Sequence, residues 1–387
     1  MSKFVELDNL YLSDELKSVR QTLRRFVKEK IIPFGEQWEE QGYVPRKLFC
    51  QLGELGLLGM SFPEDCGGSN LGALASLILS EELARSTFGG VMASVSVHTD
   101  MSASHIARHG SELMKQHYMP DIVTGRKVCA VAVTEPGAGS DVAGLKTRAR
   151  REGDHYVLNG SKMFITNGVH ADLYILAART DPEAKGSRGI SLFVIEKGTP
   201  GFSNSKALKK TGWLCSDTAQ LFLDTVRIPA KNLIGEENKG FYYIMEGFQL
   251  ERICIGGQCV GQSEKAIELT MNWLNNRQAF GKTLWDIQSI KIEMAQLVSE
   301  LAAAKQQAYY TAYLDAQGHD ALMSACMVKA HLPELLNKIL YKCVQFHGGM
   351  GYMRETAVER MSRDARILSI GGGASEVMLL EVAKQMQ

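Results

Sequence analysis

The chain has 387 residues, of which 45% are hydrophobic and 22% are charged, and this length suits two or three domains. Its 43 basic residues balance its 43 acidic residues, so charge gives no indication of binding to nucleic acid or to an anionic membrane surface. The sequence contains no apolar run of about 18 residues that would predict a membrane span. Residues 1–9 lack the apolar core of a signal peptide, so we expect a cytoplasmic protein.

The cysteines and histidines do not predict a metal site. None of the eight cysteines forms a Cys-x-x-Cys pair, which argues against a zinc ribbon or a thioredoxin-type motif. Several lie in apolar runs and are expected to be small buried hydrophobic residues of a protein from a reducing compartment. The nine histidines show no His-Glu-x-x-His or similar ligand spacing, so no metal is expected.

Residues 11–125 have a helical pattern. Leu16, Val19 and Leu23 share one face of the first segment, and Ser13 precedes two acidic residues as an N-cap would. Two further helices are predicted over residues 71–85 and 91–109. The second is rich in small residues, which permits close packing or leaves room for a ligand. We interpret residues 1–126 as an N-terminal α-helical domain.

The pattern changes near Lys127, where short apolar runs begin to alternate with turn signals. Asn159-Gly160 predicts a hairpin turn of this kind. Regular short strands without intervening helices predict an antiparallel β-barrel or sandwich over residues 127–236. The predicted strands are residues 128–134, 145–150, 155–158, 173–178, 190–195 and 220–226.

The last third of the chain, residues 237–387, returns to long helical patterns. The predicted helices are residues 241–276, 286–317, 319–346 and 374–386, which favours a four-helix bundle. The order is helical, then β, then helical, so the fold class is α+β. A doubly wound parallel sheet is disfavoured because strands and helices do not alternate.

Two segments of the β region, residues 132–144 and 159–168, suggest a bound flavin. Gly137 and Gly139 let backbone amides approach a ligand closely, and Phe164 offers an apolar face. Three residues offer hydroxyls and amides to the edge of a ring: Thr134, Ser140 and Thr166. Each segment read alone is an ordinary β-turn. Together, at this spacing, they resemble the flavin-binding signatures of the acyl-CoA dehydrogenases, although the family often has Trp at the position of Phe164.

Two further segments carry the same resemblance. Residues 277–282 and Gln288 are similar to positions that reach the flavin dinucleotide of a neighbouring subunit, where Arg277 would meet the pyrophosphate. Read alone, they would form a polar turn between helices. Residues 345–352 are similar to a glycine loop that lies against the adenosine, with His347 expected to be a loop histidine. This loop is not a Rossmann fingerprint, because no strand precedes it.

The resemblance extends from about Ser13 to Val382. It implies the acyl-CoA dehydrogenase fold, FAD as cofactor, an acyl-CoA substrate, electron-transferring flavoprotein as acceptor, and a homotetramer. The flavin-binding residues that it implies are Val131, Val133, Thr134, Gly139, Ser140, Phe164, Ile165, Thr166, Arg277, Phe280, Gln288, Gln345, Gly348, Gly349, Ala374 and Glu376.

The segment 363–376 resembles the active-site loop of this family, in which many members carry a catalytic glutamate. The matching residue here is Gly372, which can accept no proton. Glu251 stands where the isovaleryl-CoA and long-chain branch keeps its base. It shares a mostly apolar helix face with Ile244, Phe248, Ile255 and Gln258. A carboxylate there is costly unless it is paired or functional, and the alternative to a catalytic role is a pair with Arg252 or a neighbouring helix.

The implied reaction removes a proton from Cα of the thioester by Glu251 and a hydride from Cβ to the flavin, giving a trans-2-enoyl thioester. Burial would raise the pKa of Glu251 and make it a better base. A ribityl hydroxyl and the amide of Gly372 would hold the thioester carbonyl. Arg188 suits a CoA phosphate, and Asp364 is expected to fix the loop through a salt bridge. The implied substrate residues are Ser140, Ser187, Arg188, Tyr242, Phe248, Gln249, Arg252, Gly373, Val91, Val95 and Thr99.

The acyl pocket is expected to be wide. Val91, Val95 and Thr99 match the floor of the cavity in medium-chain relatives, and the small side chains there add volume, as do Gly371 and Gly372. We expect a substrate branched at C3 or C4, or one of medium to long chain, such as an isovaleryl-like or citronellyl-like thioester. The alternatives are an acyl-CoA oxidase, which is usually longer, a nitroalkane oxidase-like member, which would have Asp in the loop, and a non-catalytic relative that binds nucleic acid.

Overall fold

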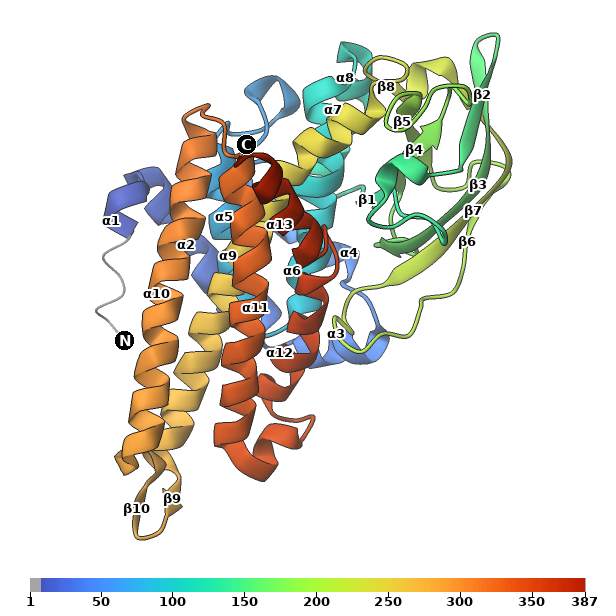
Figure 1. The fold of residues 1–387 in the computed structure, drawn as a ribbon. Coiled ribbons are helices and arrows are strands. Elements are labelled where there is room, and N and C mark those ends of the chain that lie inside the picture. The colour runs from blue at the N-terminus through green and yellow to red at the C-terminus, as the bar shows by residue number, and fades with distance from the viewer. Residues whose placement is uncertain (1–7, 387) are drawn as a thin grey trace.

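The computed structural model describes residues 8–386. The first seven residues and Gln387 lie outside it, so the absence of a signal core in residues 1–9 stays a prediction. The chain forms an N-terminal helical domain, a middle sheet domain and a C-terminal helical domain. In Figure 1 the sheet lies on one side of the molecule, and the long C-terminal helices stand on the other.

The N-terminal domain consists of short helices, with the longest connection between α4 and α5. Its α-helices are α1 (Asp8–Tyr11), α2 (Asp14–Phe26), α3 (Gly35–Gln41), α4 (Arg46–Glu54), α5 (Gly72–Ala84), α6 (Gly89–Ser96), α7 (Ser104–His109) and α8 (Glu112–Val123). The predicted cap is present, because Ser13 Oγ accepts from the amide of Leu16 at 3.2 Å. The helix predicted over residues 91–109 is a continuous helical run, but the π-helical turn η4 (Val97–Ala103) divides it.

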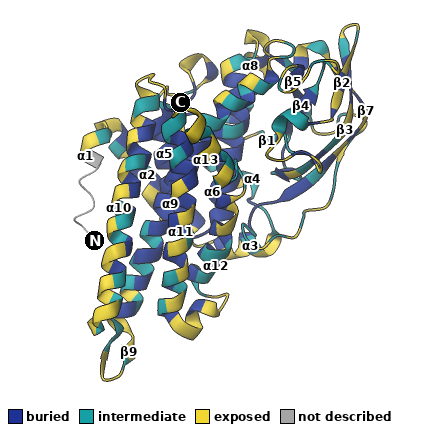
Figure 2. Ribbon diagram, viewed as in Figure 1, coloured by how far each residue is buried: buried dark blue, intermediate teal, exposed yellow. Residues whose placement is uncertain are grey.

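The interior of this domain is built around α5, which is buried on all sides and packs against the long helix α9 (Gly240–Asn276). Figure 2 shows the buried residues of α5, α9 and α11 (Leu322–His347) gathered inside the molecule. Several charged groups are buried with them. Glu81 of α5, for example, accepts from Arg20 at 3.0 Å and from Lys305 at 3.3 Å. These ion pairs join α2 and α5 to α10 (Gln288–Ala316).

The middle domain is one eight-stranded sheet. Its strands are β1 (Cys129–Ala132), β2 (Arg148–Glu152), β3 (His155–Thr166), β4 (Leu173–Arg179), β5 (Ile190–Glu196), β6 (Phe202–Asn204), β7 (Thr218–Pro229) and β8 (Leu233–Ile234), in the order β6-β7-β3-β2-β4-β5-β8 with β1 beside β4. The predicted antiparallel barrel is not found, since no sheet closes within residues 8–386. The sheet is also mixed, because β1 runs parallel to β4, as β2 does at its single pair with β4.

The predicted hairpin at Asn159-Gly160 is wrong. Both residues lie inside the 12-residue strand β3, and the pairing with β7 shifts register between Leu158 and Gly160. A β-bulge therefore absorbs the Asn-Gly pair, so the strand continues where a turn was expected. Gly160 is needed there, since a Cβ at this position would lie 2.6 Å from Thr147 Oγ1.

The C-terminal domain contains α9, α10, α11, α12 (Ala357–Ala365) and α13 (Ser375–Lys384), with a small hairpin, β9 (Gln278–Ala279) and β10 (Lys282–Thr283), between α9 and α10. The first three helices agree with the prediction. The last predicted helix is shorter than expected, and α12 was not predicted. Both short helices pack against α11, and the loop that contains Gly372 joins them.

Candidate active site

Glu251 and Gly372 lie against each other. Glu251 is on α9, and Gly372 is in the loop between α12 and α13 at φ 66°. A Cβ built on Gly372 would lie 2.6 Å from Glu251 Oε1 and 2.9 Å from Ile255 Cδ1. The carboxylate of the helix therefore fills the space beside the loop position that has no side chain.

The surroundings of Glu251 suit a general base. Glu251 is 4% exposed, and within residues 8–386 its carboxylate makes no hydrogen bond or ion pair. Burial raises its pKa to about 7, against the opposing influence of Arg252 and Lys329. A base that titrates near neutral pH can take a proton efficiently.

The alternative, in which Glu251 pairs with Arg252, is not observed. Arg252 donates from Nη1 to Cys326 Sγ at 3.4 Å. Its guanidinium lies 5.8 Å from the centre of the Phe248 ring. The adjacent residue Gln249 is also turned away from Glu251, because its side-chain amide bonds to Asp315 of α10.

Asp364 anchors the helix that precedes the loop, but not through the expected salt bridge. Its buried carboxylate accepts from the amides of Gly89 at 2.9 Å and Trp213 at 2.5 Å. The adjacent Arg363 pairs with Glu359 at 2.7 Å instead. Asp364 is on α12, which the sequence analysis treated as part of the loop. It joins that helix to the first turn of α6 and to a segment of the sheet domain.

The two predicted flavin segments lie side by side. The amide of Met163 donates to the carbonyl of Thr134 at 2.9 Å. A charged pair that the sequence did not predict holds them together: Lys162 Nζ donates to Glu135 Oε1 at 2.8 Å and to the carbonyl of Val133 at 3.0 Å. Glu135 also accepts from two backbone amides, those of residues 146 and 147. Both residues lie within the two predicted flavin segments, but nothing in their spacing predicts that they form an ion pair.

The surface formed by these segments fits a flavin. Phe164 is 64% exposed and has φ 60°, an uncommon backbone conformation for a bulky residue. It lies where the β3–β7 pairing shifts register between Lys162 and Ile165, and this bulge turns the ring outward. A Cβ on Gly137 or Gly139 would meet nothing within 4 Å. An apolar ring face and open backbone are what an isoalloxazine ring requires.

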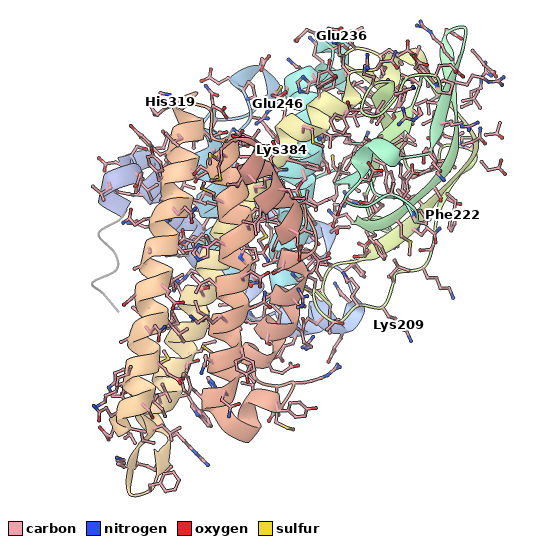
Figure 3. The ribbon with its side chains drawn as sticks, viewed as in Figure 1. Lys209, Phe222, Glu236, Glu246, His319 and Lys384 are labelled. Atoms are coloured by element: carbon pink, nitrogen blue, oxygen red, sulfur yellow. The ribbon has the colours of Figure 1, made fainter. Side chains whose placement is uncertain are left out.

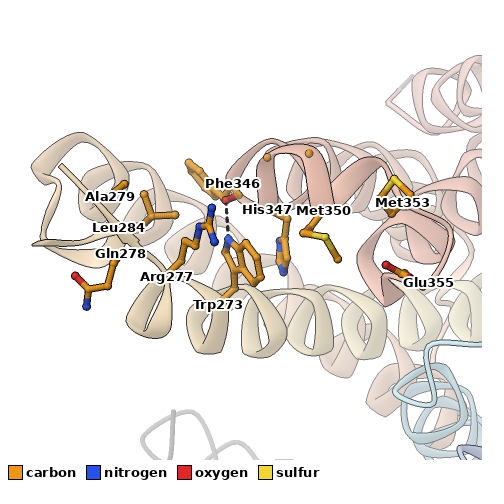
Figure 4. Close-up of a pocket in the computed structure, with 12 residues that line it drawn as sticks. Trp273, Arg277, Gln278, Ala279, Leu284, Phe346, His347, Met350, Met353 and Glu355 are labelled. Carbon is orange, nitrogen blue, oxygen red and sulfur yellow. Dashed lines mark hydrogen bonds between the residues drawn. The ribbon is translucent and has the colours of Figure 1, made fainter. Parts of the chain in front are cut away.

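A second group of predicted flavin residues lies at the far end of α9. Arg277, Gly348 and Gly349 line one pocket of about 640 Å³ (Figure 4). Its wall includes Trp273, a residue that the sequence analysis missed. The indole Nε1 of Trp273 donates to the carbonyl of Phe346 at 3.1 Å, and the guanidinium of Arg277 lies 5.7 Å from the Trp273 ring.

His347 belongs to this pocket and is not a loop histidine. It is the last residue of α11, with Nδ1 2.8 Å from the carbonyl of Cys343. Its buried ring stacks on Trp273 at 5.2 Å with 21° between the planes. Phe280, in the β9–β10 turn, is 93% exposed.

The structure does not bring the two groups together within one chain. Glu251 is on α9 and Arg277 is the residue that follows its last turn, so the rise of about 1.5 Å per residue separates them by about 39 Å along the helix. The other predicted flavin residues divide between the two ends. Near the sheet or the Gly372 loop lie Val131, Val133, Ser140, Ile165, Thr166, Ala374 and Glu376; at the far end lie Phe280, Gln288 and Gln345.

The residues predicted for the acyl group are buried on α6 and η4. Val91 and Val95 are inaccessible to solvent. Thr99 Oγ1 lies 3.1 Å from the carbonyl oxygen of Val95 and 2.7 Å from Asp100 Oδ2. Asp100 is a further buried carboxylate that the sequence analysis missed, and burial raises its pKa. Three other residues predicted to contact the acyl-CoA are at least partly exposed: Ser187, Tyr242 and Arg188, of which Arg188 was expected to meet a CoA phosphate.

Within the described residues 8–386, no helix is long and apolar enough to cross a membrane. They show no group of His, Cys, Asp or Glu side chains that could hold a metal ion. All eight cysteines are free, and all but Cys50 are buried, as predicted.

Comparison with known proteins identifies the class to which this fold and site belong. Family models of the acyl-CoA dehydrogenase N-terminal, middle and C-terminal domains match residues 13–126, 130–226 and 238–387. The chain therefore belongs to the acyl-CoA dehydrogenase family, whose members are FAD-dependent oxidoreductases that act on CH–CH bonds.

Individual relatives support the same family assignment. The chain is 40% identical over 381 residues to the mitochondrial long-chain specific acyl-CoA dehydrogenase of Rattus norvegicus, covering 97% of this chain and 87% of the relative. It is 36% identical over 376 residues to the mitochondrial isovaleryl-CoA dehydrogenase of Pongo abelii, covering 96% and 89%. A glutaryl-CoA dehydrogenase from Mycobacterium smegmatis, solved in complex with FADH2, superposes with a TM-score of 0.91 at 29% identity, covering 98% of this chain and 96% of that one.

Proposed function

We propose that this protein dehydrogenates an acyl-CoA thioester to the trans-2-enoyl-CoA, with Glu251 as the base. The contact between Glu251 and Gly372 carries this proposal. The family chemistry needs a carboxylate beside Cα, and the loop supplies none. The carboxylate of Glu251 lies where a side chain on Gly372 would lie, and its pKa of about 7 suits proton abstraction.

FAD, when bound, accepts the hydride from Cβ of the substrate. We propose that Phe164 supports the ring and that the backbone around Gly137 and Gly139 contacts the cofactor, since these residues present an exposed ring and open backbone. Glu251 takes the proton from Cα. The amide of Gly372 donates to the thioester carbonyl, and such a donor lowers the barrier by about 3 kcal/mol in comparable sites. Glycine retains this N–H while leaving room for Glu251.

We also propose that a second chain completes each flavin site and that the working form is a homotetramer. A separation of about 39 Å is longer than an extended dinucleotide, so Arg277 cannot contact a flavin that lies beside Glu251 of its own chain. Phe280 is almost fully exposed at the same end, as expected of a residue that docks on another subunit. Electron-transferring flavoprotein as acceptor and a cytoplasmic location complete the proposal.

The decisive experiment is Glu251→Gln. The variant should keep the yellow flavin spectrum, but anaerobic bleaching by acyl-CoA should slow by about 10²- to 10⁴-fold, because Glu251 is the carboxylate that lies against Gly372. Glu246→Gln is the matched control, since Glu246 is an exposed acid on the same helix (Figure 3). A loss of less than tenfold in Glu251→Gln would show that another residue is the base.

For the substrate we propose an acyl chain that is branched at C3 or C4 or of medium to long length. A Cβ on Gly371 would approach no atom closer than 3.7 Å, so the loop leaves space there. A panel of acyl-CoAs with an artificial electron acceptor tests this, and Gly371→Phe should depress turnover of the branched and long substrates most. Best wild-type turnover with butyryl-CoA would contradict the proposal, and rapid peroxide formation in air would indicate an oxidase.

A further inference from the structure

The loop beside Glu251 is made of three consecutive glycines, Gly371, Gly372 and Gly373. Such a segment loses more conformational entropy on ordering than any other, and yet the amide of Gly372 must be placed accurately. On its N-terminal side the loop is held by the helix before it, because the amide of Gly371 donates to the carbonyl of Ile367 at 2.8 Å. Gly372 and Gly373 have φ of 66° and 97° and continue no helix.

Lys329 of α11 holds the other side of the loop. Its Nζ donates to the carbonyl of Gly373 at 2.6 Å. Among residues 8–386 this is the only side-chain hydrogen bond to the backbone of the three glycines. The bond joins residues 44 positions apart in the sequence, so it fixes the loop to the core of the helical domain.

The burial of Lys329 indicates a role beyond packing. Its side chain is completely buried, and in the described part of the chain it has no ion pair with a carboxylate. A buried ammonium without an ion pair is costly. Burial lowers its pKa to about 8, while Cys259 and Glu251 oppose that change. A functional reason for this energetic cost is that the positive charge of Lys329 acts on the carboxylate of Glu251.

The charged and titratable groups around this position are few. Glu251 is affected by Arg252 of its own helix and by Lys329 of α11. Lys329 is affected in turn by Cys259, Glu251 and Arg252 of α9 and by Glu334 of α11. The loop itself contributes only glycine backbone. Among residues 8–386, Lys329 is therefore the one cation that donates to the glycine loop and also acts on the proposed base.

We propose that Lys329 is a positioning residue for the dehydrogenation, on the basis of the function proposed above: its ammonium fixes the carbonyl of Gly373, and so holds the amide of Gly372 and the carboxylate of Glu251 in register with the thioester. The positive charge also favours the ionised form of the base. In this role Lys329 acts through the loop carbonyl and through Glu251, not by contact with the reacting carbon atoms.

The test compares Lys329→Met with Lys329→Arg in the purified, FAD-loaded enzyme. In Lys329→Met we expect kcat to fall by roughly 10- to 100-fold with KM changed less than about threefold, because the contact acts in the transition state. The acidic limb of the kcat–pH profile should move to higher pH, since losing a cation makes Glu251 harder to ionise. Lys329→Arg, which keeps charge and donor, should restore the position of that limb.

A folded, flavin-loaded Lys329→Met enzyme with the wild-type kcat and acidic limb would overturn the inference. If that variant does not fold, Lys329→Gln takes its place and the same outcomes decide. Glu251→Gln in parallel separates the two proposals. If it keeps wild-type turnover, the assigned base is wrong whatever Lys329 does. If it is inactive while the Lys329 variants behave as wild type, only the positioning role fails.

Discussion

The two ends of α9 are built in different ways. In the N-terminal third, which is the buried end, Glu251 is buried and its carboxylate lies against Gly372 of its own chain. At the other end Arg277 and the loop at Gly348 surround an open pocket of about 640 Å³, and Phe280 extends into solvent. The first end is complete within one chain, whereas the second offers surfaces that have no partner in the described residues.

We propose that this difference separates two kinds of function along α9. Proton transfer needs a desolvated group whose position is fixed, and the buried end provides it. Binding the phosphates and adenosine of a dinucleotide needs accessible donors and apolar walls, and the open end provides those. Changes at the two ends should therefore affect different measurements.

The largest effect is expected from placing a second acid at the buried end. Gly372→Glu should reduce turnover by roughly 10³-fold, because a Cβ there lies 2.6 Å from Glu251 Oε1 and the positive φ disfavours a side chain. Anaerobic flavin reduction by acyl-CoA measures it. The double variant Glu251→Gly with Gly372→Glu should recover part of the loss; failure to recover any would mean that the loop cannot present an acid in this chain.

The next effect is on stability. Burial raises the folded-state pKa of Glu251 to about 7. The contribution of this carboxyl to the free energy of unfolding is therefore fully present below its unfolded-state pKa, and it is lost as the pH rises through about 7. Glu251→Gln should therefore stabilise the protein by about 3 kcal/mol at pH 8 and by less at pH 5.5. Thermal unfolding at both pH values measures this, and equal changes at the two would contradict it.

In the wild type kcat/KM should rise as pH increases through about 7.

The smallest effect is expected at the open end. Arg277→Ala should weaken FAD retention by about 10- to 100-fold, through loss of a charge-assisted phosphate contact, while leaving the acidic limb of the pH profile unchanged. Phe280→Asp should weaken assembly, as size-exclusion chromatography would show. Phe222→Asp is the control, since Phe222 is an exposed Phe on β7 of the sheet (Figure 3). If Arg277→Ala bound FAD as tightly as the wild type, this pocket would not be part of the cofactor site.

The sequence predicted the features that depend on local pattern. Periodicity located α9, α10 and α11, and the missing side chain at Gly372 pointed to Glu251. It failed where distant residues decide the outcome. The Asn159-Gly160 pair is a good turn in isolation, but pairing with β7 extends the strand through it. Nothing local shows that Lys162 reaches Glu135 or that Lys329 reaches the glycine loop, because these contacts exist only after the domains fold.

The 2.6 Å separation between a Cβ at position 372 and the acid on α9 also limits how this enzyme could have changed over time. A chain with a full side chain at both positions has to displace one of them, so an ancestor with its acid in the loop would crowd that acid by acquiring the second one first. Removing the loop acid first leaves no base at all. Either order passes through an impaired form, so the exchange needs two nearly simultaneous substitutions or an intermediate under relaxed selection.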